Sequence, residues 1–285
     1  MAKFENQPVH DIGVSAGVHG KRRLLRGRFG KSPRGEGGPG VPLVRTLQKK
    51  PIRTASGRVE AFIANPKAVK RGVRYIDENL AFCLGEPASN ANTYEGQLVP
   101  GILERLRNKD LVVDMHEQPD SGEEDFMYVG SSAALPILGF AAQVGITTIF
   151  VGSYGIYRHY SQAGAADVSK TSQRNDVDYW RAQFETALEE GLPSPSVEEF
   201  TIFALTSLTT NEIRQLGLNG KRLTPFEEIR GASDLLKVDR PVYTVYSVNS
   251  SSPGIEVVTQ LRPHEISIED GIVRMPTFRS LAGSQ

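Results

Sequence analysis

The chain has 285 residues, of which 39% are hydrophobic and 23% charged, a composition typical of a protein with a buried core. Its 33 basic and 33 acidic residues balance, which argues against general binding to nucleic acid or to an anionic membrane. A single cysteine, Cys83, excludes an internal disulfide framework, and no apolar run approaches the roughly 20 residues that span a bilayer or has the character of a signal peptide. These features predict a cytoplasmic protein.

The first two thirds of the chain alternate short apolar runs with amphipathic stretches. Strands are expected at residues 8–18, 57–65, 111–115 and 146–151, and helices at residues 41–50, 94–108, 132–144 and 177–190. In the second of these helices, Leu98, Ile102 and Leu106 recur at helical spacing. Because strands alternate with helices, the sequence predicts an α/β fold with a mostly parallel sheet flanked by helices.

Residues 21–40 interrupt this pattern. Seven basic side chains lie between residues 21 and 34, and no acid appears before Glu36. We expect a solvated basic loop inserted into the main domain. An RNA or an acidic partner is an alternative, and it would bind in a strongly salt-dependent manner.

The pattern changes again after residues 191–196. Short β-prone runs follow at residues 200–208, 242–248, 255–261 and 272–275. The sequence therefore predicts two domains, an α/β domain over residues 1–195 and a small β-rich domain over residues 196–285.

Two histidines stand at predicted strand ends, where open α/β sheets place their functional sites. His19 follows the first strand, and His116 follows residues 111–115. Imidazoles held at rigid strand ends suit a metal ion, although a single such histidine is more often structural. Asp114 lies two residues before His116 and is well placed to orient a ligand imidazole.

Five short motifs occur in a fixed order over about a third of the chain. They are GVHG at 17–20, NPKAV at 65–69, RYIDENL at 74–80, YE at 94–95 and DMH at 114–116. In this order they resemble the succinylglutamate desuccinylase/aspartoacylase family, a group of zinc-carboxypeptidase-like proteins. The resemblance thins out beyond about residue 130. It implies a zinc-carboxypeptidase-like hydrolase domain over residues 1–195.

The resemblance also implies roles for particular residues. His19 and His116 would be ligands of one Zn²⁺ per chain, which would activate a water for attack on an amide. Arg74 would bind the substrate, polarise the scissile carbonyl and stabilise its oxyanion. Asp77 would hold Arg74 and its loop in place. The partner would be a small-molecule N-acyl substrate.

The third metal ligand departs from the family pattern. The family's glutamate ligand lies three residues after the first histidine, where this chain has Arg22, which cannot bind zinc. The pattern resumes at Glu36, after the basic insertion. A loop can be lengthened at modest entropic cost, because that cost grows only logarithmically with length. Glu36 is therefore the candidate third ligand, and the alternative is a surface glutamate in the loop.

The substrate-binding motif also departs. The family's Asp-Leu-Asn-Arg becomes Asn79-Leu80-Ala81-Phe82, so the groups that grip a substrate carboxylate are replaced by apolar ones. We therefore expect the substrate to be a less acidic or more apolar acyl compound than acetylaspartate or succinylglutamate.

Two alignments are possible for the family's general base, a glutamate in a strand. One places Phe150 there and implies an inactive protein. The other places Asp167 there, keeps the spacing to the helix at 177–190, and leaves Arg158 near the place of the family's substrate-binding arginine; we prefer it. Glu117 is a spare carboxylate for the same role, or a solvated loop acid.

Two functions from different classes follow. The first is a zinc-dependent amide hydrolase, or deacylase, acting on an N-acyl amino acid or a similar small amide. The second is a catalytically silent relative that binds a small ligand or a partner. The sequence leaves a homo-oligomer open.

Overall fold

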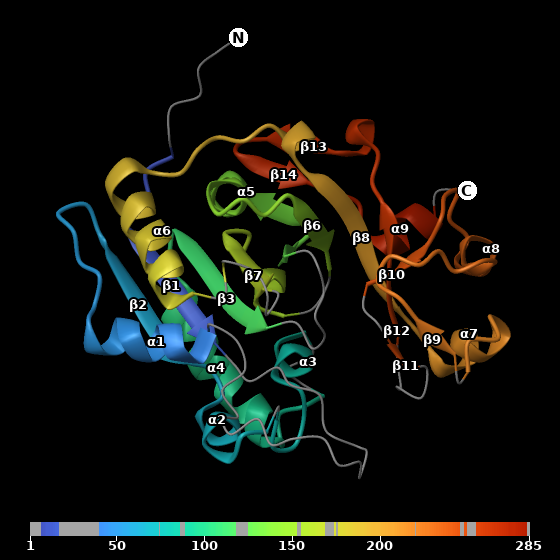
Figure 1. Cartoon of the computed structure of the whole chain (residues 1–285), viewed down its shortest axis with the longest axis horizontal. Helices are drawn as coiled ribbons and strands as arrows, with labels where there is room; N and C mark the ends of the chain where they lie inside the picture. The colour runs from blue at the N-terminus through green and yellow to red at the C-terminus, as the bar shows by residue number, and fades with distance from the viewer. Residues whose placement is uncertain are drawn as a thin grey trace.

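The computed structural model describes residues 7–16, 40–73, 75–85, 89–117, 125–152, 155–168, 174, 176–219, 221–245, 248–249 and 255–283. The strands of the main sheet are β1 (Asp11–Ala16), β2 (Arg58–Ile63), β3 (Leu111–Glu117), β4 (Phe126–Val129), β6 (Thr148–Val151), β7 (Ala163–Val168), β8 (Thr201–Leu208), β10 (Tyr243–Thr244) and β12 (Ile255–Gln260). They lie in the order β10-β12-β8-β6-β4-β7-β3-β1-β2 (Figure 1).

The sheet consists of two parallel blocks that meet antiparallel. Strands β2, β1, β3 and β7 run one way, and β4, β6 and β8 run the other way. The blocks join between β7 and β4, and β12 and β10 add antiparallel strands at one edge. The predicted α/β fold with a mostly parallel sheet is confirmed. One consequence is that the carboxyl ends of β3 and β7 lie beside the amino ends of β4 and β6.

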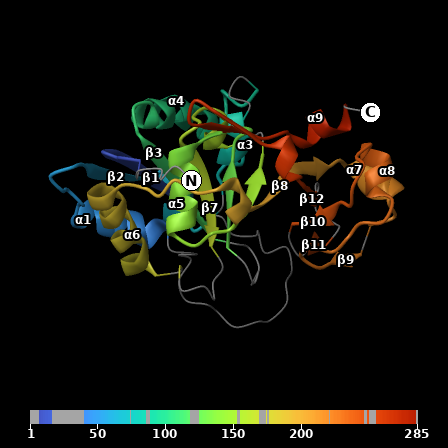
Figure 2. The same cartoon turned by 90° about the horizontal axis from the view of Figure 1, so that it is seen from above.

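Helices cover both faces of this sheet. The described helices are α1 (Gly40–Lys49), α2 (Pro66–Arg71), α3 (Leu80–Gly85), α4 (Tyr94–Leu106), α5 (Leu135–Gln143), α6 (Val177–Glu190), α7 (Thr210–Gln215), α8 (Ala232–Leu236) and α9 (Phe278–Ala282). Figure 2 shows α4 on one side of the sheet and α1 and α6 on the other. None of the described helices is long and apolar enough to cross a bilayer.

Each face of the sheet has its own apolar core. On the α1 side, Val14 and Leu43 pack with Phe140, Trp180 and Phe184. On the α4 side, buried side chains of α3 and α4 pack on an aromatic strip of the sheet, which includes Phe62, Phe126, Phe150 and Phe203. The candidate site lies on this second face, as shown below.

The predicted helix at 177–190 is confirmed by α6, and the helix predicted at 94–108 ends at Leu106. The helix predicted at 132–144 is wrong in its first three residues. Ser132–Ala134 form β5, which pairs with β14 (Ile272–Arg274) in a small sheet completed by β13 (Ser267–Glu269). The helix begins only at Leu135, and Pro136 suits its first turn. Pairing with a strand 140 residues away leaves no trace in the local sequence pattern.

Residues 196–285 continue the main sheet. Strand β8 pairs with β6 from the first part of the chain, and β12 pairs with β8. The short strands β9 (Arg222–Leu223) and β11 (Val248–Asn249) pair separately. Strands from both sides of residue 195 thus share one sheet, and the division into two domains at this point remains a prediction.

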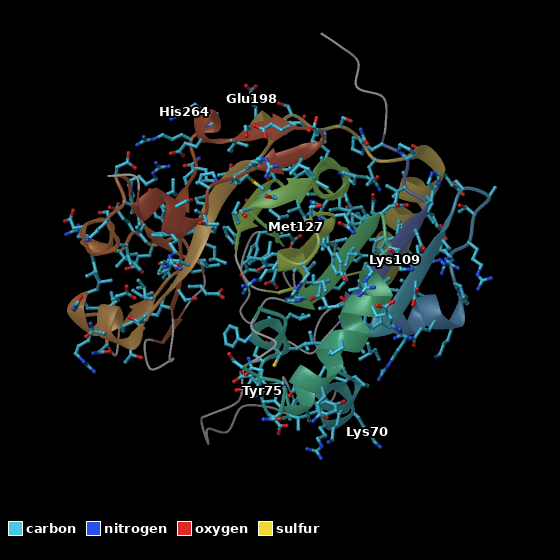
Figure 3. The ribbon with its side chains drawn as sticks, turned by 180° about the vertical axis from the view of Figure 1, so that it is seen from behind. Lys70, Tyr75, Lys109, Met127, Glu198 and His264 are labelled. Carbon is cyan, nitrogen blue, oxygen red and sulfur yellow. The ribbon has the colours of Figure 1, made fainter. Side chains whose placement is uncertain are left out.

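A buried cation marks the end of the sheet where β1, β2 and β3 begin. Lys109 Nζ lies 3.1 Å from Asp11 Oδ1 and 2.8 Å from Glu60 Oε2, and its side chain is only 6% exposed. Figure 3 places Lys109 near the C-terminal end of α4 and Tyr75 near the other end of that helix. The two carboxylates lie next to the ammonium group of Lys109 and compensate its positive charge.

Candidate functional site

The last residues of β3 carry a chain of polar side chains. His116 Nε2 lies 2.7 Å from Asp114 Oδ2, and the Ser15 hydroxyl donates a hydrogen bond of 2.8 Å to Asp114 Oδ1. Asp114 and His116 are two residues apart in a strand, so both side chains point to the same face. Ser15 lies opposite Asp114 on β1 and shares that face. The predicted contact between Asp114 and His116 is confirmed, and Ser15 was not predicted.

Asp167 stands beside His116 on the neighbouring strand. The two residues are register partners of β3 and β7, so their backbones are about 4.8 Å apart and their side chains share a face. Asp167 is 4% exposed. The structure thus brings together two of the residues chosen from sequence, an imidazole and a buried carboxylate.

Phe150, the alternative to Asp167, lies elsewhere on this face. It pairs with Tyr128 on β4 and packs against the rings of Phe126 and Phe203. Its position is that of an aromatic core residue two strands away from Asp167. Glu117 closes β3, and its side chain lies outside the described part of the chain.

Tyr157 is a residue of this face that the sequence did not indicate. It lies in the 3₁₀ helix η1 (Ile156–Arg158), is 5% exposed, and stacks on Tyr128 with ring centroids 6.3 Å apart. Burial raises the pKa of its phenol well above 10, and the negative charges of Glu256, Asp114 and Asp167 raise this pKa further. The phenol therefore stays protonated and can donate a hydrogen bond at any physiological pH.

A glycine allows Tyr157 to fold back over the sheet. Gly155 has φ of 86°, a conformation that favours glycine. A Cβ at this position would lie 3.1 Å from the Tyr157 ring. Position 155 is therefore restricted by both its backbone and the ring above it.

Arg158, the predicted substrate-binding arginine, contacts the end of α3. Its Nη1 donates a hydrogen bond to the Gly85 carbonyl, and the neighbouring His159 Nε2 lies 2.6 Å from the Leu84 carbonyl. These two side chains tie η1 to α3. Of the two adjacent residues in η1, Tyr157 lies within electrostatic reach of Asp114 and Asp167, and Arg158 binds a helix end.

The segment at 75–79 is fixed to the start of α4. Glu95 accepts hydrogen bonds from the backbone N–H groups of Ile76 (2.6 Å), Asp77 (3.0 Å) and Glu78 (3.1 Å). In return, Asp77 Oδ2 accepts from the Tyr94 N–H at 2.8 Å. Asp77 therefore ties the loop to the helix, as expected, whereas its expected hold on Arg74 concerns a residue outside the described part of the chain.

Several predicted residues lie outside the described part of the chain. These are His19, Glu36, Arg74 and the whole basic loop at 21–34. Of the three expected metal ligands, the structure describes only His116. Within the described residues, no group of three His, Cys, Asp or Glu side chains could hold a metal ion.

The environment of His116 nevertheless fits a metal ligand. An imidazole that binds zinc through one nitrogen usually has the other nitrogen hydrogen-bonded to a carboxylate or carbonyl. Asp114 engages Nε2, so a metal ion that His116 binds in this orientation would be held by Nδ1. The neighbouring Asp167 carries a carboxylate, a group that can exchange a proton with a water.

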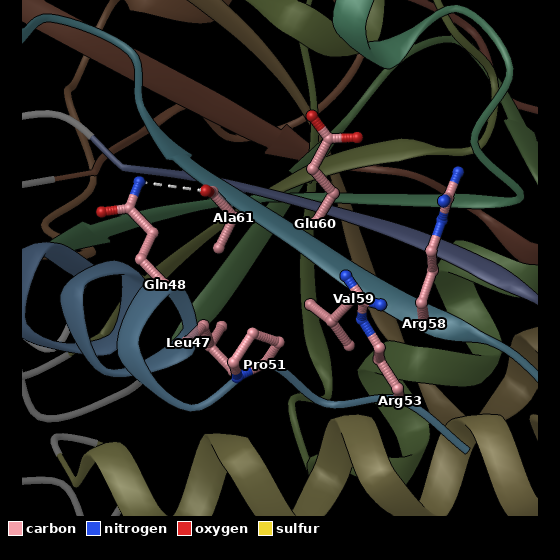
Figure 4. Close-up of a pocket in the computed structure, with 8 residues that line it drawn as sticks. All are labelled: Leu47, Gln48, Pro51, Arg53, Arg58, Val59, Glu60 and Ala61. Atoms are coloured by element: carbon pink, nitrogen blue, oxygen red, sulfur yellow. Dashed lines mark hydrogen bonds between the residues drawn. The ribbon is translucent and has the colours of Figure 1, made fainter.

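A cavity of about 270 Å³ lies away from these residues, between α1 and the edge strand β2 (Figure 4). It is lined by Leu47, Gln48, Pro51, Arg53, Arg58, Val59, Glu60 and Ala61. Val59 and Ala61 alternate with Phe62 along β2 and so face α1 rather than α4. The apolar part of its lining therefore belongs to the α1 side of the sheet, opposite to the face that carries His116.

Several solved structures have a similar fold, among them the following two. The crystal structure of murine aminoacylase 3 has a TM-score of 0.53 and 16% identity, over 90% of this chain and 98% of that chain. Succinylglutamate desuccinylase from Chromobacterium violaceum has a TM-score of 0.59 and 15% identity, over 90% of this chain and 86% of that chain. No protein-family model matches the sequence, and no curated protein matches it in sequence. The chain therefore has the fold of succinylglutamate desuccinylase and aminoacylase 3, which confirms at the level of the fold the resemblance predicted from its five motifs.

Proposed function

We propose that this chain is a divergent member of the succinylglutamate desuccinylase/aspartoacylase family that hydrolyses the amide bond of an N-acyl amino acid or a similar small amide. The observation that carries the proposal is the pairing of His116 and Asp167 on neighbouring strands. His116 is oriented by Asp114, and Asp114 is held by Ser15. The chain shares its fold with an aminoacylase and a succinylglutamate desuccinylase, whose names denote amide hydrolysis, and this likeness also supports the proposal.

The reaction assigns a distinct task to each residue. When bound, one Zn²⁺ held by His19, Glu36 and His116 would supply Lewis acidity toward the amide carbonyl and an acidified water. Asp167 takes a proton from the attacking water and returns it to the departing amine. Arg74 stabilises the negative charge that develops on the carbonyl oxygen. Asp114 keeps the His116 ring in one orientation.

The segment at 79–82 supports a substrate without a second carboxylate at this position. Asn79 is buried, and its Oδ1 accepts a hydrogen bond of 3.2 Å from the Ala81 N–H at the start of α3. Its amide oxygen caps α3, and Ala81 and Phe82 stand where the family has an asparagine and an arginine. Phe82 is 51% exposed and has no charge to offer a carboxylate. N-acyl amino acids with apolar side chains are the substrates we propose.

The proposal is tested by measuring amine release from N-acetyl-L-methionine, N-acetyl-L-phenylalanine and N-acetyl-L-aspartate. The wild type is expected to hydrolyse the apolar compounds faster than N-acetylaspartate. Asp167→Asn should lower kcat by about 10²–10⁴-fold, the usual contribution of a general base. Glu189→Gln, at an exposed position of α6, is the matched control and should leave kcat unchanged.

The catalytically silent relative is the second candidate. One observation favours it: Asp167, which we align with the family's glutamate, is almost fully buried, and its side chain is one methylene shorter than that of a glutamate. A folded, zinc-loaded wild type that hydrolyses none of the three compounds, nor other small N-acyl amides, would support this candidate and contradict the hydrolase.

A further inference from the structure

Glu95 is a buried acid to which the proposed reaction assigns no role. It lies in the first turn of α4, and its exposed fraction is 0%. Its Oε1 accepts hydrogen bonds from the Ile76 N–H at 2.6 Å and from Asn65 Nδ2 at 2.9 Å. Its Oε2 accepts from the N–H groups of Asp77 and Glu78 at 3.0 and 3.1 Å. One carboxylate therefore binds three consecutive backbone amides and a buried side-chain amide.

The charge of this carboxylate is kept in the folded chain. Burial raises the pKa of Glu95, but the hydrogen bonds from Ile76, Asn65, Asp77 and Glu78 outweigh this effect and lower the pKa below its ordinary value. A buried carboxylate is costly unless such donors surround it. The positive end of the α4 dipole favours the same charge. Glu95 is thus an anion around which the backbone at 76–78 is arranged.

The attachment is reciprocal, so the segment has little freedom to move. Asp77 Oδ2 accepts from the Tyr94 N–H at the start of α4. Asn65, which donates to Glu95, also caps α2 by accepting from the Ala68 N–H at 3.1 Å. The end of β2, the segment at 75–79 and the first turn of α4 are therefore joined through one acid.

This segment connects two parts of the candidate site. Arg74 precedes it in the sequence, and α3 follows it. The last carbonyls of α3, at Leu84 and Gly85, bind His159 and Arg158 of the η1 region. Tyr157 lies in the same 3₁₀ helix and is within electrostatic reach of Asp114 and Asp167. A shift of residues 76–78 would thus move the start of α3, and the contacts at the other end of α3 would pass this shift to the η1 region that carries Tyr157.

We propose that Glu95 is a positioning residue, whose carboxylate fixes residues 76–78 and thereby sets the place of α3, and with it that of Tyr157, relative to the reacting amide. This inference rests on the proposed amide hydrolase function. It assigns to Glu95 no contact with the substrate. Its effect on the reaction passes through the backbone that it holds.

The test compares Glu95→Gln and Glu95→Asp with Glu104→Gln, a control at an exposed position of the same helix. Glu95→Gln removes the charge and turns one acceptor into a donor that faces N–H groups. With N-acetyl-L-methionine, kcat is expected to fall on the order of 100-fold, the scale of a displacement of about 1 Å, while KM changes less than about threefold. Glu95→Asp keeps the charge and should recover part of the lost kcat. Glu104→Gln should behave as the wild type.

Hydrogen–deuterium exchange gives a readout independent of activity. The amides of Ile76, Asp77 and Glu78 should exchange at least tenfold faster in Glu95→Gln, while those of the strand β3 keep their wild-type rates. A folded Glu95→Gln variant with wild-type kcat would overturn the positioning role. Should Glu95→Gln fail to fold, an unchanged kcat in Glu95→Asp would overturn it.

The failure of the two proposals can be told apart. A wild type without any amidase activity contradicts the proposed function, and the catalytic part of this inference falls with it. Hydrogen–deuterium exchange at the amides of Ile76, Asp77 and Glu78 then tests, without any activity measurement, whether Glu95 fixes this segment. Unchanged exchange in Glu95→Gln would show that the carboxylate does not fix the segment.

Discussion

At the scale of single residues, the orientation of His116 depends on a carboxylate that is itself held by a hydroxyl. If His116 binds zinc, loss of the Asp114 charge should weaken that binding by about 10–100-fold, the usual effect of such a partner. Asp114→Asn tests this, with zinc affinity measured by competition against a chromophoric chelator. Ser15→Ala should have a smaller effect, because it removes a contact to Asp114 rather than to His116. Wild-type zinc affinity in Asp114→Asn would contradict the assignment.

Glu95 gives a prediction for the pH dependence of stability. Its pKa in the folded chain is lower than its unfolded value of about 4.3. The ionised group therefore stabilises the fold at all pH values above about 4.3, and this contribution is lost as the pH falls through the folded pKa. The difference in unfolding free energy between wild type and Glu95→Gln should be constant from pH 5 to 7 and shrink below about pH 4. Urea unfolding at each pH measures it, and a difference that does not shrink would contradict the prediction.

Part of the site was predictable from the sequence because it depends on short spacings. Side chains two residues apart in a strand lie on the same face, which is why the contact of Asp114 with His116 could be expected. The position of Ser15 could not, since it depends on the pairing of β1 with β3, almost 100 residues later. Nor does the sequence tell which of Tyr157 and Arg158 faces the sheet, because the answer depends on the turn that begins at Gly155.

At the scale of elements, α6 is held by an aromatic cluster. Phe184 stacks on Phe140 of α5 with ring centroids 5.4 Å apart and an angle of 6°, and Trp180 packs beside both. Phe184→Ala should therefore destabilise the fold by about 3–5 kcal/mol. Glu189→Ala, on the exposed side of the same helix, should change stability by less than about 0.5 kcal/mol. Urea midpoints measure both, and equal midpoints would contradict the role given to this cluster.

Helices and strands were predicted correctly where buried residues recur at a regular spacing in the sequence. Helix α6 has buried residues at Trp180, Phe184 and Leu188, a regular spacing that the sequence displays. Strands β4 and β7 are buried on both faces, so they show no alternation, and no strand was predicted at β4. Strand β5 was predicted as the start of a helix. Its extended conformation depends on pairing with β14, which lies far along the chain and is not visible in the local sequence.

At the scale of the whole molecule, the main sheet passes without interruption from the first part of the chain to the last. Trp180 is the only tryptophan and reports on the part before residue 195, whereas far-UV circular dichroism reports on all elements. Because β8 bonds to both β6 and β12, we expect the two signals to change at the same urea concentration. Two separate midpoints would instead support independent domains on either side of residue 195.

The central claim is that His116 binds a catalytic metal beside Asp167, and the zinc content of the purified protein tests it most directly. Elemental analysis of the wild type should find close to one zinc per chain. The His116→Ala variant, shown to be folded by circular dichroism, should contain almost none. A folded wild type that takes up no zinc, or a His116→Ala variant that retains it fully, would contradict the account.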